Sequence, residues 1–149
     1  MRMRNRRSYL PVRILLLTLS FAPMALAGEG APPVATITPA DAAAQVNAGD
    51  AVLVDVRERN ELDAGMAQGA RWYPTSSIKS DPDAYVAFLA SLPADQTVVF
   101  YCASGVRSGK AAELARQKTG RKTANLGGFK DWKSAGLPVT TPAKTLSPG

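Results

Sequence analysis

Apolar residues along this chain gather into short continuous runs that alternate with helically spaced stripes. Residues 51–56 and 97–101 are nearly continuous apolar runs rich in Val, a pattern typical of strands buried on both faces. Residues 71–73 and 123–126 are shorter stretches that also favour an extended conformation. The sequence therefore predicts four strands.

Helix signals lie between the predicted strands. Thr38 before Pro39, and Asp81 before Pro82, each combine an N-cap side chain with a proline in the first turn. The first of these helices is expected to run to residue 48 and to end at Gly49. The second carries a core-facing apolar stripe formed by Tyr85, Phe88, Leu89 and Leu92. Further helices are expected over residues 58–64, 107–118 and 129–134.

Strands that alternate with helices predict an α/β fold, with a parallel sheet covered by helices on both faces. The expected organisation is a signal peptide over residues 1–27, a flexible lead-in over 28–36, one domain over 37–139 and a disordered tail over 140–149. No internal repeat and no second domain is expected.

The first 27 residues have the order of a secretory signal peptide. Five arginines precede an apolar stretch at residues 14–22, and the small-x-small sequence 25–27 follows, so cleavage is expected after Ala27. The stretch has about half of the roughly 20 apolar residues that a membrane span needs, so no stable membrane insertion is expected after cleavage. The mature protein is expected to be periplasmic or secreted. Arg6-Arg7 also resembles the twin-arginine export motif, so both that route and the general route stay open.

Charge and composition exclude several classes of function. Without the five leader arginines, thirteen basic residues face twelve acidic ones, and a net charge of +1 gives no reason to expect nucleic acid as a partner. The chain has one Cys and no His, so an internal disulfide and both Ser-His-Asp and Cys-His catalysis are excluded. A zinc site would need mostly carboxylates, and no metal is expected.

The single cysteine, Cys102, directly follows the strand predicted over residues 97–101. In open α/β sheets ligands bind beyond the carboxyl ends of the strands. Residues 103–106 form a short loop before a helix, and such loops turn backbone N–H groups inward and lower the pKa of a thiol. Gly105 supplies backbone freedom and Arg107 a positive charge. A lone Cys in an arbitrary chain is more often a small core residue, but this position favours a nucleophile.

The loop Cys102-Ala103-Ser104-Gly105-Val106-Arg107-Ser108 resembles the C-x-x-G-x-R-S active-site loop of rhodanese-like domains. Three other segments resemble motifs of the same family in the same order: residues 53–61, 65–70 and 126–139. The resemblance covers nearly the whole chain after the signal peptide. It implies a five-stranded, mostly parallel sheet between helices. Met66 stands where the family commonly has His, and Trp72 where a smaller polar residue is frequent.

The resemblance implies a sulfurtransferase that needs no cofactor and carries sulfur as a Cys102 persulfide. It takes sulfane sulfur from thiosulfate or a similar small anion and passes it to cyanide or a thiol. Substrate contacts are expected from the backbone of residues 103–107, that is from Ala103, Ser104, Gly105, Val106 and Arg107. Because Ala103 and Ser104 are small and uncharged, an open pocket over the thiol is expected.

Other motif residues are expected to support the site. Asp55 and Arg57 would hold the loops at the end of the sheet, and Ser108 closes the loop motif. Trp72 either walls the entrance to the site or is ordinary packing, and the sequence leaves both open.

Two alternative functions stay open. A relay or binding module would pass the persulfide to a protein thiol and turn over cyanide poorly. A cysteine phosphatase on the same fold would resemble C-x5-R, whereas the spacing from Cys102 to Arg107 is C-x4-R, a tighter ring that fits sulfur better than a phosphoester.

Overall fold

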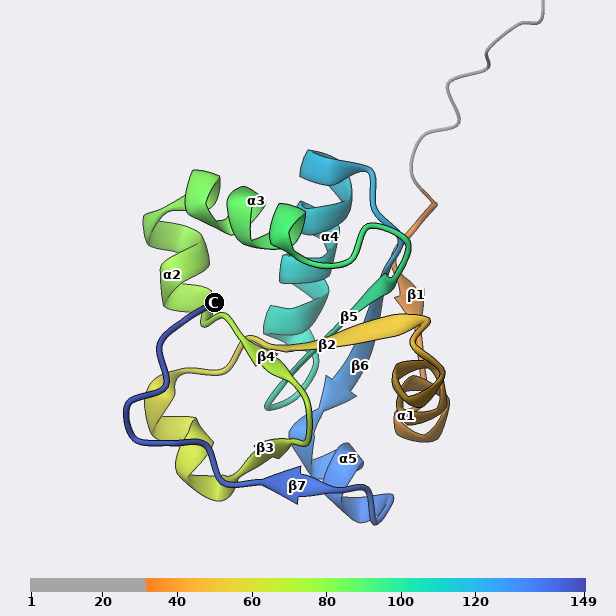
Figure 1. The fold of residues 1–149 in the computed structure, drawn as a ribbon, viewed down its shortest axis with the longest axis vertical. Helices are drawn as coiled ribbons and strands as arrows, with labels where there is room; N and C mark the ends of the chain where they lie inside the picture. Colours follow the sequence, from red (N-terminus) through yellow and green to blue (C-terminus); the bar gives the residue numbers. More distant parts are fainter. Residues whose placement is uncertain (1–31) are drawn as a thin grey trace, which may run out of the picture.

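Two strands with nearly every residue buried, β2 (Ala51–Asp55) and β5 (Thr97–Cys102), lie at the centre of the structure, a computed structural model that describes residues 32–149. The predicted signal peptide lies outside the described residues. The other strands of the sheet are β1 (Ala35–Thr36), β4 (Arg71–Trp72) and β6 (Thr123–Gly128). The order is β1-β6-β5-β2-β4 and every pair of neighbours is parallel (Figure 1). The predicted α/β fold with a five-stranded sheet is confirmed.

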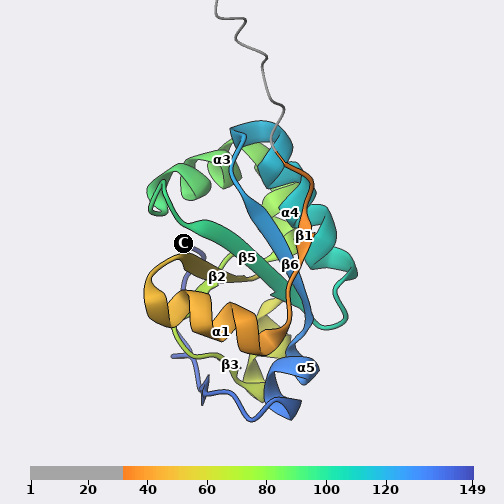
Figure 2. The same cartoon turned by 90° about the vertical axis from the view of Figure 1, so that its right-hand side faces the viewer.

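Helices cover both faces of this sheet. On one face lie α1 (Pro39–Ala48) and α5 (Phe129–Ser134). On the other lie α2 (Thr75–Ser80), α3 (Pro82–Ser91) and α4 (Val106–Thr119), and Figure 2 shows α1 and α4 on opposite sides of the strands. A 3-10 helix, η1 (Arg59–Ala64), follows β2, and a small antiparallel sheet pairs β3 (Met66–Ala67) with β7 (Val139–Thr140).

The two-sided burial explains the apolar runs. Along β5, Val98, Phe100 and Cys102 face the core under α3 and α4, whereas Val99 and Tyr101 face the core under α1 and α5. Successive side chains of a strand point to opposite faces, so a strand covered on both sides must be apolar at every position. Cys102 therefore lies on the α4 side, at the carboxyl end of the central strand.

Local signals placed most of the helix starts correctly. Thr38 caps α1, where its hydroxyl accepts a hydrogen bond from the Asp41 amide at 3.1 Å, and Gly49 ends the helix with φ +81°. Asp81 caps α3 in the same way through the Ala84 amide at 2.9 Å. The short helix α2 was not predicted, because it spans only six residues and its face has one buried side chain, Ile78.

The two ends of the described chain differ from the prediction. Ala35–Thr36, expected in a flexible lead-in, form β1, because the edge of β6 offers backbone partners that the sequence does not reveal. Thr140, expected in a disordered tail, belongs to β7, and the chain beyond it packs on the domain. Leu146 lies against a buried cluster of Leu62, Met66 and Trp72, and the Gly149 amide donates to the Trp72 carbonyl at 3.0 Å. Within residues 32–149, no helix has the length and apolar character needed to cross a bilayer.

Candidate active site

Cys102 is the last residue of β5 and lies beside Gly128 of β6 in the register of the sheet. At Cys102 the strand β5 ends at the carboxyl end of the sheet, and the chain turns from there into α4. Gly105 makes that turn with φ +94°, a backbone conformation that favours glycine, and acts as the N-cap of α4. The sulfur thus lies between the end of a strand and the start of a helix, as the loop motif predicts.

Hydrogen-bond donors converge on the sulfur. The Gly105 amide lies 3.1 Å from Cys102 Sγ, and the Ser108 hydroxyl lies 3.5 Å from it. Burial raises the pKa of the thiol. The hydrogen bonds from the Ser108 hydroxyl and from the amides of Ser108, Ser104 and Gly105 together lower it by more than burial raises it. The pKa of Cys102 therefore lies below its ordinary value near 9.0. The donors favour the thiolate because a hydrogen bond to the charged form stabilises that form.

The thiol is more enclosed than the sequence suggests. Cys102 has 0% of its surface exposed, whereas Ala103 and Ser104 are exposed. The expectation of an open pocket over the thiol is therefore wrong for this conformation, because the same loop whose amides turn toward the sulfur also covers it. A sulfur donor therefore reaches the thiol only if the loop moves.

We call residues 102–108, which carry the candidate nucleophile Cys102, the catalytic loop. Asn125 of β6 holds this loop, a role that the sequence did not predict. Its amide nitrogen donates to the Gly105 carbonyl at 2.9 Å, and its Oδ1 accepts from the Ser108 hydroxyl at 2.8 Å and from the Gly127 amide at 3.1 Å. One side chain thus ties both the turn and the hydroxyl beside Cys102 to the neighbouring strand. The signal was a polar amide between the apolar residues Ala124 and Leu126, where an unpaired side chain would be costly.

The catalytic loop packs directly on the backbone of β6. The register of β5 and β6 shifts after Phe100, so that Tyr101 pairs with Gly127. A Cβ at Gly128 would lie 2.7 Å from the Ala103 carbonyl oxygen, and one at Gly105 would lie 3.1 Å from the Gly127 Cα. Because these residues have no Cβ, the loop can lie directly against the backbone of β6, and a larger side chain at either position would push the two backbones apart.

Arg107 does not stand as a free cation at the site. Its two terminal nitrogens each donate to one carboxylate oxygen of Glu61 in η1, both at 2.7 Å. The hydrogen bonds with Glu61 raise the pKa of Arg107, and those from Arg107 lower the pKa of Glu61. The nearby charge of Cys102 also raises the pKa of Arg107, so the guanidinium lies within electrostatic range of the sulfur. Glu61 ends the motif segment 53–61, and only the tertiary structure shows that it is the partner of Arg107.

Asp55 and Arg57 form a buried network behind the site. Their side chains are 0% and 3% exposed, and Arg57 Nη2 lies 2.6 Å from Asp55 Oδ2. Arg57 also donates to the Glu61 carbonyl at 3.1 Å and to the Gly65 carbonyl at 2.7 Å, which holds η1 in the position where Glu61 meets Arg107. Trp72 is buried and donates from Nε1 to the Arg57 carbonyl at 2.9 Å, so it packs the network and does not wall an entrance.

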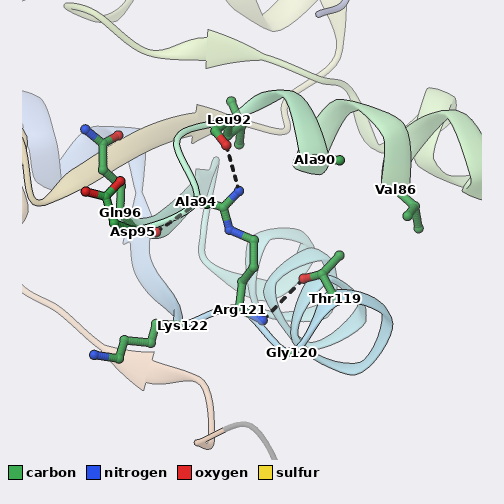
Figure 3. A pocket seen from close by; sticks show the side chains of 10 residues that line it. All are labelled: Val86, Ala90, Leu92, Ala94, Asp95, Gln96, Thr119, Gly120, Arg121 and Lys122. Carbon is green, nitrogen blue, oxygen red and sulfur yellow. Dashed lines mark hydrogen bonds between the residues drawn. The ribbon is translucent and has the colours of Figure 1, made fainter.

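A cavity of about 650 Å³ lies at the amino ends of β5 and β6, whereas Cys102 lies at the carboxyl end of β5 (Figure 3). Its lining includes Gln96 before β5 and Lys122 before β6. The guanidinium of Arg121 donates there to the carbonyls of Leu89 at 2.6 Å and Leu92 at 3.1 Å, and also to those of Pro93 and Gln96. This arginine holds the end of α3, and Cys102, the one cysteine of the chain, lies at the other end of the strands.

Comparison with known proteins decides the family. The rhodanese-like domain family matches residues 38–135. The chain belongs to this family. The predicted resemblance is therefore confirmed.

Individual relatives narrow the class. Thiosulfate sulfurtransferase GlpE of Actinobacillus succinogenes is 34% identical over 106 residues, which cover 70% of this chain and 89% of that protein. Uncharacterized protein YqhL of Bacillus subtilis is 40% identical over 83 residues, which cover 55% of this chain and 60% of that protein, less than two thirds of its length. A solved structure from Rhodopseudomonas palustris, described as a protein of unknown function and possible tyrosine phosphatase, is 34% identical with a TM-score of 0.58, and covers 72% of this chain and 85% of its own. Rhodanese-like proteins related to this one thus include sulfurtransferases.

Proposed function

We propose that this protein is a sulfurtransferase that moves sulfane sulfur from thiosulfate, or a similar small donor, to cyanide or a thiol through a persulfide on Cys102. The observation that carries the proposal is the single thiol whose pKa is lowered by converging donors at the end of the central strand. The name of the Actinobacillus relative supports the donor class. No organic cofactor or metal is needed, because sulfur itself is the transferred group.

The reaction has two half-reactions in a ping-pong scheme. The Cys102 thiolate attacks the outer sulfur of thiosulfate, a new S–S bond forms, and sulfite leaves with the electron pair of the broken bond. Cyanide or a thiolate then attacks the outer sulfur of the persulfide and releases the Cys102 thiolate. No general base is needed where the thiol reacts as its thiolate, a form that the surrounding hydrogen-bond donors favour, and this suits a chain without His. The amides of the loop favour the anionic sulfur species.

Loop geometry favours this chemistry over phosphate transfer. The Gly105 amide lies 3.1 Å from Sγ, so the donors converge on one sulfur atom. A phosphoryl group would need those donors farther out, around its own oxygens. The spacing C-x4-R agrees with the tighter ring.

The experiment is intact-mass measurement of wild type and Cys102→Ala after incubation with thiosulfate, before and after cyanide. We expect a gain of one sulfur that cyanide removes as thiocyanate, and no gain in the variant. A wild type that stays unmodified, or one that hydrolyses phosphotyrosine in a vanadate-sensitive way, would refute the proposal.

We also propose that the protein acts after export, in the periplasm or outside the cell, on the strength of the leader arginines, the apolar stretch 14–22 and the sequence 25–27. N-terminal sequencing of the protein recovered from the periplasm or medium of a Gram-negative expression host tests this. A chain that begins at Gly28 is the expected result, and an uncleaved chain retained in the cytoplasm would contradict it.

A further inference from the structure

A groove of about 230 Å³ lies next to the catalytic loop, between α2 and the first turns of α4. Ile78 and Leu114 contribute apolar surface to it, and the Arg107 side chain lines it on the side of the catalytic loop. Val106, which also lines the groove, is 63% exposed, although it belongs to the loop that holds the sulfur. An exposed aliphatic side chain beside a nucleophile is surface that a binding partner can cover.

The charged residues of the groove all have one sign. Lys79 of α2 and Lys110 of α4 line it from two different helices, and both are exposed. Neither lysine forms an ion pair within residues 32–149, and no acidic residue lines the groove. The third cation, Arg107, is already paired with Glu61. Two unpaired lysines around an apolar floor select a partner that carries both carboxylates and an apolar side chain.

We propose that this groove receives an acidic segment of an acceptor protein whose cysteine takes the sulfur from Cys102. The proposal rests on the sulfur transfer proposed above and names its acceptor. A volume of about 230 Å³ is below the roughly 300–1,000 Å³ of small-molecule sites, so the groove holds one apolar side chain and not a whole ligand. Acidic residues on either side of that side chain meet Lys79 and Lys110.

The transfer itself is balanced without any further reactant. The acceptor thiolate attacks the outer sulfur of the Cys102 persulfide and a new S–S bond forms on the acceptor. The bond between the two sulfurs on Cys102 breaks, and its electron pair returns to the Cys102 thiolate. The groove contributes by holding the acceptor cysteine near the loop, which raises its effective concentration.

The test measures the second half-reaction alone, on enzyme first loaded with sulfur from thiosulfate. The acceptors are two synthetic peptides that each contain one cysteine followed by Gly-Gly and then Asp-Leu-Glu or Lys-Leu-Lys, a third with Asp-Gly-Glu, and reduced glutathione. The variants are the double substitution Lys79→Glu with Lys110→Glu, and a matched control, Lys118→Glu with Lys122→Glu. The control changes the net charge equally, at exposed positions near the far end of α4.

At low salt, the acidic peptide should remove sulfur at least about tenfold faster than the basic one, and high salt should reduce the difference, because exposed charges are screened. The groove double variant should reverse the preference, the control should keep it, and the peptide with Gly in place of Leu should react several-fold more slowly.

Equal rates for the acidic and basic peptides, or equal losses in both double variants, would overturn the proposal. If glutathione takes sulfur faster than the acidic peptide, and the groove double variant slows that transfer as well, the groove serves a small thiol and the proposal is also overturned. Failure of thiosulfate to load the enzyme would refute the proposed function, whereas normal loading without peptide discrimination refutes the groove alone.

Discussion

Ser108→Ala tests whether side-chain hydrogen bonding sets the reactivity of Cys102. The Ser108 hydroxyl has one hydrogen and two acceptors within reach, Cys102 Sγ at 3.5 Å and Asn125 Oδ1 at 2.8 Å. When the thiol ionises, we expect the hydrogen to turn from the amide oxygen to the sulfur anion, because the anion is the stronger acceptor. The variant loses that stabilisation of the thiolate but keeps the backbone amides that also lower the pKa.

The size of the effect follows from the two bonds. A hydrogen bond to a charged group contributes about 1.5–3 kcal/mol and a neutral one about 0.5–1.5 kcal/mol, so their exchange favours the thiolate by about 1–1.5 kcal/mol. One pKa unit corresponds to about 1.4 kcal/mol, so the substitution should raise the pKa of Cys102 by about one unit. Below both pKa values the thiolate population falls about tenfold, and the higher intrinsic nucleophilicity of a more basic thiolate offsets about threefold of that loss. The net loss in sulfur loading is about threefold.

The assay is absorbance at 240 nm as a function of pH, with Cys102→Ala as the baseline, and it is clean because the chain has one thiol. The control is Ser104→Ala, which removes an exposed hydroxyl and keeps the amide that faces the sulfur. The control midpoint should match wild type, while that of Ser108→Ala moves up. A midpoint that stays in place or moves down in Ser108→Ala would refute the assignment of that hydroxyl to the thiolate.

Three further predictions concern the supports of the site. Glu61→Gln should lower the free energy of unfolding at neutral pH, and by progressively less as pH falls below 4.5. The reason is that the ion pair with Arg107 lowers the pKa of Glu61, so wild type loses this stabilisation as the carboxylate is protonated. Urea melts from pH 3 to 7 check this, and a difference in stability that does not change with pH would contradict it. Arg57→Met should lower the free energy of unfolding by about 3–5 kcal/mol, because it leaves the buried carboxylate of Asp55 without its partner. Adding Asp55→Asn should restore part of this loss, and a double variant less stable than Arg57→Met alone would argue against the pair. Gly128→Ala should push the Ala103 carbonyl and slow sulfur transfer by up to about 100-fold while circular dichroism still shows a folded domain; unchanged transfer kinetics would show that the close approach is not needed.

Much of the architecture was readable from local pattern. The runs at β2 and β5 had to be apolar at every position because helices cover both faces, and that pattern alone predicted a doubly covered sheet. Thr38 and Asp81 marked helix starts because capping depends on neighbours three residues away. The catalytic loop was readable for the same reason: Cys102, the Gly105 turn and the start of α4 are contiguous, so their geometry follows from a short stretch of chain.

Interactions between distant segments were decided only by the tertiary structure. Asn125 holds the loop by a hydrogen bond to Gly105, 20 residues earlier in the chain, and Glu61 pairs with Arg107, 46 residues later. Neither contact could be inferred from the spacing of residues in the sequence. The enclosure of Cys102 also depends on how the loop rests on Gly128, which composition does not reveal. Short-range backbone preferences and side-chain periodicity act within a few residues and can be read in order along the chain. Ion pairs, burial and the approach of one backbone to another depend on which segments the fold brings together, and that is known only once the sheet is assembled.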